Sequence, residues 1–101
     1  NKLQIWEKVV EEIEELKVEV EKKNKERIES EFGDVLFALI NYARFIDVNP
    51  EDALERCNKR FIKRFQIMEK KLKEEEKDLS DMNLEEMEKY WQWAKNEYLN
   101  T

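Results

Sequence analysis

Residues that interrupt helices are almost absent from this chain, which contains one glycine, Gly33, and one proline, Pro50. Both residue types disfavour helix interiors and mark turns, so their scarcity over 101 residues favours a few long helices. Charged residues make up 44% of the chain, and most are Glu and Lys, which are good helix formers. No stretch alternates apolar and polar residues for long enough to predict a strand. We therefore expect an all-α fold in one domain.

Apolar residues at spacings of three and four predict four helices joined by short connections. Asn49 and Asn83 are expected to cap the third and fourth helices, with Glu86 completing a capping box at the fourth. Short connections between four helices predict an antiparallel, four-helix-bundle-like packing. The helices are expected over about residues 3–22, 26–46, 50–73 and 83–98.

The second helix is apolar on every side over residues 35–40. A helix that is hydrophobic all round is normally buried all round, and one bundle of this length could hardly cover it. We therefore expect a homodimer or a higher homo-oligomer that buries this helix. A central helix within a compact monomer is the alternative.

Several classes of function are disfavoured by composition. The chain has no histidine, which excludes imidazole zinc sites, histidine-activated nucleophiles and the Glu-x-x-His di-iron motif. Its net charge of −6 disfavours binding to a nucleic-acid polymer. No apolar stretch is long enough to span a membrane. The lone Cys57 suits a reducing cytoplasm, and its helical neighbours Leu54 and Phe61 predict a small core residue rather than a reactive thiol.

Two pairs of acidic residues form the candidate site. Glu12 and Glu15 lie one turn apart in the first helix, as do Glu31 and Asp34 in the second. Four converging carboxylates would repel one another unless a cation lay among them, and all-oxygen ligands favour Mg²⁺ or Mn²⁺. Glu19 continues the column of Glu12 and Glu15 and is a candidate accessory ligand. Solvated acidic faces are the alternative that spacing alone leaves open.

Gly33 lies between Glu31 and Asp34 and favours a site over a solvated face. Glycine inside a helix costs about 0.5–1 kcal/mol relative to alanine, so we expect another group to approach the backbone there. A ligand or a closely packed helix would each explain it.

The order of the motifs resembles the EExxE…ExxD signature of the all-α nucleoside triphosphate pyrophosphohydrolases, and in particular their MazG family. Residues 11–15 and 31–34 carry this signature, and residues 31–37 are similar to the family's E-x-G-D-L-L-F segment. Further similar segments are N-L-A-R at 41–44, P-E-E-A-L at 50–54 and N-x-K-F-x-R-R-F at 58–65. The resemblance extends over roughly residues 6–95.

This resemblance implies an enzyme that hydrolyses NTP or dNTP to the monophosphate and pyrophosphate, with a role in nucleotide-pool housecleaning. It implies that Mg²⁺, or Mn²⁺ in its place, binds to Glu12, Glu15, Glu31 and Asp34. It also implies that residues 1–101 are one MazG-like domain without the helical segment that usually precedes the first motif. The phosphate contacts of the family fall on Arg60 and Arg64, although without the resemblance a solvated basic face over residues 59–64 would be the better explanation of these two residues.

Within this expectation, Glu11 or Glu15 would orient or deprotonate the attacking water, and Asn41 would help to position the ligand. Two other functions are left open by the sequence. One is a helical oligomerisation module without catalysis, and the other is a narrower hydrolase of the same superfamily that acts on dUTP or dCTP.

Overall fold

A computed structural model describes residues 1–100, which form four α-helices and one short 3-10 helix. No strand occurs in this described part, so the predicted all-α class is confirmed. The chain divides into two compact units, residues 1–53 and residues 54–101. No helix within residues 1–100 combines the length and the apolar character that crossing a membrane requires. The helices are α1 (Lys2–Lys22), α2 (Lys25–Phe45), α3 (Pro50–Glu74) and α4 (Leu84–Leu99), with η1 (Leu79–Asp81) before α4.

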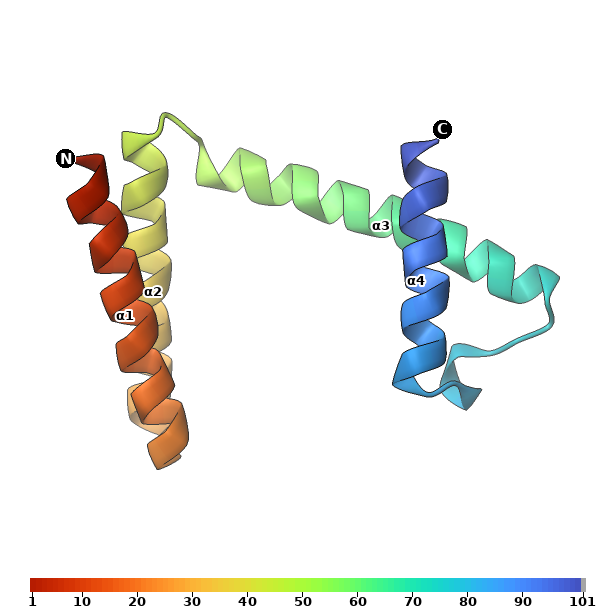
Figure 1. Ribbon diagram of the computed structural model, residues 1–101, viewed down its shortest axis with the longest axis horizontal. Coiled ribbons are helices and arrows are strands. Elements are labelled where there is room, and N and C mark those ends of the chain that lie inside the picture. The colour runs from red at the N-terminus through yellow and green to blue at the C-terminus, as the bar shows by residue number, and fades with distance from the viewer. Residues whose placement is uncertain (101) are drawn as a thin grey trace. The chain divides into compact units, whose positions relative to one another are not determined.

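The first unit is a hairpin of α1 and α2, which lie side by side (Figure 1). Lys23 ends α1 in the left-handed conformation, and the side chain of Asn24 then accepts a hydrogen bond from the amide of Arg27 to begin α2. These local signals turn the chain within two residues, so the helices run antiparallel. The apolar side chains buried in this unit are Val9, Val35, Ala38 and Ala43.

Both predicted N-caps are confirmed, whereas the Glu86 side chain makes no hydrogen bond in the described residues that would complete the predicted capping box. The Asn49 side chain accepts a hydrogen bond from the amide of Asp52 at 3.1 Å, at the start of α3. The Asn83 side chain accepts one from the amide of Glu86 at 2.8 Å, at the start of α4. An asparagine at this position satisfies a helix amide that has no partner inside the helix, which is why sequence alone locates these boundaries well.

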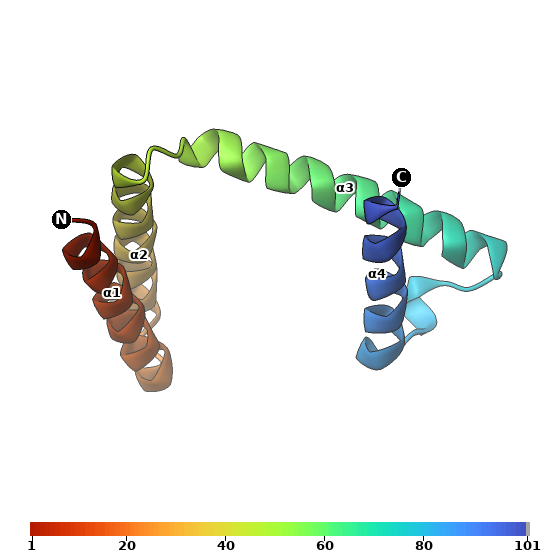
Figure 2. The same cartoon turned by 45° about the horizontal axis from the view of Figure 1, so that its top comes forward.

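In the second unit, α4 packs on the C-terminal half of α3 (Figure 2). Met68, Leu72 and Ala94 form the buried cluster, and the connection through η1 places Leu79 and Met82 against it. The packing of all four helices into one bundle stays a prediction.

Cys57 is exposed, so the prediction that it is a small core residue was wrong. The helical spacing to Leu54 and Phe61 is as expected, but both of these side chains are exposed too. Trp91 of α4 contacts Phe61, with ring centroids 5.2 Å apart, but the buried residues of α3 begin further along, at Met68. An apolar stripe therefore predicts which face of a helix can be buried, and a neighbouring helix decides over what length it is.

The apolar surface of α2 is also only partly buried within the chain. Val35 and Ala38 are buried, whereas Leu36, Phe37 and Ile40 are exposed. Burial on all sides, which the sequence predicts for residues 35–40, is thus not reached by the packing of α1 on α2. On α1, Trp6 contacts Tyr42 of α2 with ring centroids 5.1 Å apart and still keeps much of its surface exposed.

Candidate metal centre

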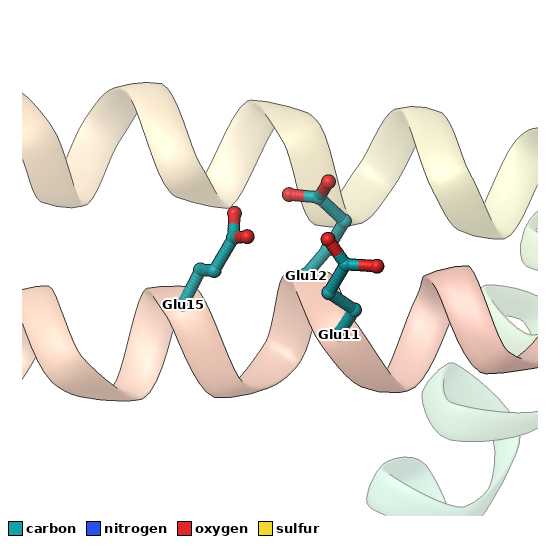
Figure 3. Close-up of side chains that lie close together, drawn as sticks. All are labelled: Glu11, Glu12 and Glu15. Carbon is teal, nitrogen blue, oxygen red and sulfur yellow. The ribbon is translucent and has the colours of Figure 1, made fainter.

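Five carboxylates converge between α1 and α2 in two overlapping groups. Glu11, Glu12 and Glu15 form one group, and Glu12, Glu31 and Asp34 form the other. In each group the nearest carboxylate oxygens lie within 4.8 Å of one another, and Glu12 belongs to both. Figure 3 shows the carboxylates of Glu12 and Glu15 pointing from α1 towards α2. The structure therefore groups Glu12 of α1 with both acidic residues of the α2 pair, whereas Glu15 belongs to the group of Glu11 and Glu12.

Glu12 is the buried centre of this arrangement, with only 7% of its surface exposed. Its Oε2 atom is buried and accepts no hydrogen bond from any residue of the described chain, and the same holds for Oε2 of Glu31. A buried carboxylate oxygen without a partner is destabilising, and an ion bound at that point is one explanation for it. Because every available donor is a carboxylate oxygen, the residues fit a hard divalent cation such as Mg²⁺ or Mn²⁺.

The charges of the cluster act on Glu15. The neighbouring carboxylate of Glu12, followed by partial burial and the carboxylate of Glu31, raises the pKa of Glu15 above its ordinary value. Each of these causes disfavours the charged form of Glu15. A cation bound here would remove this repulsion.

Lys8 is the basic residue that the sequence interpretation left without a role. Its ammonium lies 2.8 Å from Oε1 of Glu12 and 3.4 Å from Oε1 of Glu11. Hydrogen bonds to Glu12 and then to Glu11 raise the pKa of Lys8 above its ordinary value. The signal that could have found this contact is the spacing, because Lys8 precedes Glu12 by four residues and so faces it on the helix.

The two accessory candidates lie outside the two groups. Glu19 is buried, with Oε1 3.9 Å from the guanidinium of Arg27, and its Oε2 has no hydrogen-bond partner in the described chain. Asn41 is half-buried on α2, seven residues beyond Asp34. Roles for Glu19 and Asn41 in ligand binding stay predictions.

Gly33 has open space beside it. Beyond the backbone of its own helix, a Cβ atom placed on Gly33 would meet no atom of the hairpin within 4 Å. Close packing of α1 against Gly33 is therefore not observed within this unit.

The two candidate phosphate-binding residues belong to the second unit. Arg60 is exposed on α3, whereas Arg64 is half-buried with its guanidinium carbon 5.1 Å from the centre of the Tyr98 ring. The Nε atom of Arg64 is buried and donates no hydrogen bond to any residue in 1–100. Stacking on Tyr98 restrains the guanidinium, and a planar guanidinium suits bidentate binding of phosphate oxygens. Phosphate binding by Arg60 and Arg64 stays a prediction.

Comparison with known proteins agrees with the motif order. The profile of the MazG nucleotide pyrophosphohydrolase domain matches residues 1–68. The nucleoside triphosphate pyrophosphohydrolase/pyrophosphatase MazG of Thermotoga maritima is 38% identical over 91 residues, which cover 90% of this chain and 34% of that protein. The nucleoside triphosphate pyrophosphohydrolase of Escherichia coli K12 is 33% identical over 98 residues, covering 95% of this chain and 37% of that protein. YabN of Bacillus subtilis is 49% identical over 75 residues, covering 74% of this chain and 15% of that protein. The chain thus spans about a third of the length of the first of these relatives.

Proposed function

Because this chain belongs to the MazG nucleotide pyrophosphohydrolase domain family, we propose that it hydrolyses nucleoside triphosphates to the monophosphate and pyrophosphate with Mg²⁺, or with Mn²⁺ in its place. The observation that carries the proposal is Glu12, a buried carboxylate that belongs to both acidic groups and has one oxygen without a hydrogen-bond partner. A solvated acidic face would leave such an oxygen in water, so this feature favours a binding site. Two of the three relatives are named nucleoside triphosphate pyrophosphohydrolases, which supports this substrate class.

In this proposal Glu12, Glu15, Glu31 and Asp34 would supply the oxygen ligands of the cation, with the buried Glu12 at the centre of the cluster. When bound, a divalent cation neutralises phosphate charge and lowers the pKa of a bound water molecule. Glu11 and Glu15 are the members of the cluster on the exposed side of α1, so either carboxylate can orient a water molecule or accept its proton. The resemblance assigns the contacts with the departing pyrophosphate to Arg60 and Arg64.

The central experiment measures pyrophosphate release by Glu31→Gln and Asp34→Asn. Each substitution removes one anionic ligand at nearly constant volume, and we expect at least a roughly 100-fold loss of Mg²⁺-dependent release, because substitutions beyond the ligands already cost about 10–100-fold. Glu29→Gln, an exposed change on the same helix, is the matched control. Full Mg²⁺-dependent release by folded Glu31→Gln or Asp34→Asn would show that the site is assigned wrongly.

A nucleotide panel separates this proposal from its two rivals. Canonical and damaged nucleotides are supplied with Mg²⁺ or with a chelator, and pyrophosphate is measured in each case. Broad activity that the chelator abolishes supports a housecleaning role. Activity restricted to dUTP or dCTP indicates the narrower hydrolase. No release from any nucleotide indicates a non-catalytic helical module.

We also propose that a second copy of the chain covers the exposed apolar side chains of α2, and that the protein acts in the cytoplasm. Phe32, Leu36 and Phe37 are large apolar residues, and each exposes about half of its surface or more. Grouped exposed apolar residues often mark an interface. Sedimentation should show a dimer or a larger species that Leu36→Asp shifts towards the monomer, with Lys25→Asp as an exposed control on the same helix. A wild-type protein that sediments as a monomer would contradict the proposal that a second copy covers these side chains.

A further inference from the structure

Lys8 lies against the carboxylate cluster where it can act as a cation belonging to the protein. It contacts Glu12 and Glu11 from one helical turn away on α1. Within the described residues, no other ammonium or guanidinium group forms an ion pair with the five carboxylates of the two groups. One positive charge therefore partly balances a cluster that carries up to five negative charges.

The contact with Glu12 differs from an ordinary surface ion pair. The Glu12 side chain is nine-tenths buried, whereas about half of the Lys8 side chain is exposed. A buried carboxylate without a counter-ion is costly, so the ammonium stabilises Glu12 in its position between the helices. Because a lysine ammonium sits on a flexible, largely solvated stem, it can also move into water when another cation takes its place.

We propose that Lys8 is a built-in counter-ion of the metal centre, which holds Glu12 in place in the metal-free protein and competes with the divalent cation for it. This inference rests on the proposed function, since it assumes that a divalent cation binds at Glu12. Lys8 is a positioning residue in this scheme. It weakens metal binding but keeps the carboxylate cluster between α1 and α2 folded before a metal ion binds.

The test is the affinity for Mg²⁺ alone, measured by titration calorimetry on Lys8→Met, Lys8→Arg and the wild type. Lys17→Met is the matched control, because Lys17 is exposed on α1 and forms no ion pair in the described chain. We expect Lys8→Met to bind Mg²⁺ about two- to five-fold more tightly, the range that an ion pair of this exposure contributes. Lys8→Arg keeps the charge and should bind Mg²⁺ as the wild type does or more weakly, and Lys17→Met should match the wild type.

Thermal unfolding gives a second readout that needs no substrate. Without Mg²⁺, Lys8→Met should unfold at a lower temperature than the wild type. Added Mg²⁺ should raise the unfolding temperature of Lys8→Met by more than that of the wild type. If Lys8→Met does not fold without metal, Lys8→Arg carries the test, and an affinity for Mg²⁺ higher than that of the wild type would contradict competition. Unchanged or weaker Mg²⁺ binding by folded Lys8→Met would overturn the inference and leave the proposed function intact. Wild-type protein that binds no Mg²⁺ would overturn both.

Discussion

The two compact units of the chain differ in what lies between their helices. In residues 1–53 the buried groups between α1 and α2 include the carboxylates of Glu12 and Glu19. In residues 54–100 the buried cluster of Met68, Leu72 and Ala94 is entirely apolar. Buried carboxylates cost stability unless they are paired, whereas buried apolar groups contribute to it. Under the proposed function, the buried carboxylates lower the stability of the first unit in favour of a binding site, whereas apolar packing stabilises the second unit.

Net charge also differs between the two units. Residues 1–53 contain 14 acidic and 8 basic side chains, whereas residues 54–101 contain 11 of each. The net charge of −6 therefore comes entirely from the first unit. A triphosphate is itself an anion, so an acidic unit can bind it only with cations in between. In the second unit, basic side chains lie over aromatic rings, and the Nζ atom of Lys71 is 4.9 Å from the centre of the Trp93 ring.

Among the changes that test this difference between the two units, the largest effect on stability is expected in the apolar cluster of the second unit. Leu72 is 4% exposed, and Leu72→Ala should lower the free energy of unfolding by about 2–5 kcal/mol through lost burial and a residual cavity. Denaturant unfolding measures the change. Leu84→Ala, at a position that is 81% exposed, is the control and should cost far less. Equal costs for the two changes would show that this cluster does not stabilise the second unit.

A smaller effect of opposite sign is expected in the first unit at Gly33. Gly33→Ala removes a flexible residue from a helix and meets open space, so it should stabilise the metal-free protein by about 0.5–1 kcal/mol. Thermal unfolding and pyrophosphate release are measured together. Stabilisation with full activity would mean that neither a ligand nor a partner chain lies against Gly33. Lost activity or a lost oligomer, despite a stable fold, would mean that a ligand or a partner does.

The smallest effect is the response of each unit to acid, which should have opposite signs. The neighbouring carboxylate of Glu12 raises the pKa of Glu15, so the contribution of Glu15 to stability increases as the pH falls towards 4.5 and is lost as the pH rises through its raised pKa. In the second unit, a hydrogen bond from the Tyr90 hydroxyl lowers the pKa of Glu75. Its contribution is present above pH 4.5 and is lost as the pH falls through the lowered pKa.

Amide hydrogen exchange, followed residue by residue from neutral to acidic pH without metal, measures the two units separately. Glu15→Gln should remove the acid dependence that Glu15 contributes to the hairpin, and Glu75→Gln the dependence that Glu75 contributes to the other unit. If neither variant differs from the wild type, the two pKa shifts do not contribute to stability.

Helix boundaries could be predicted closely because they depend on neighbouring residues. Asn49 and Asn83 cap helices as expected, since a cap is a hydrogen bond within three residues of sequence. Burial was predicted less well. Cys57 has apolar neighbours at helical spacing and is nevertheless exposed, because α4 packs further along α3. Packing depends on contacts between distant segments, which a helical pattern constrains but does not specify.

The sequence by itself determined the all-α class and the helix ends, together with the one-turn spacing of Glu12 with Glu15 and of Glu31 with Asp34. These properties follow from local hydrogen bonding and from the helical repeat. Only the tertiary structure decided that Glu12 is the carboxylate shared by both groups and that one of its oxygens is buried without a partner. The contact of Lys8 with Glu12 follows from their four-residue spacing on α1, and the tertiary structure added the burial of the Glu12 side chain. The physical reason is that the pairing of α1 with α2 sets which side of each acidic column is removed from water, and burial changes the energy of a charge far more than spacing does.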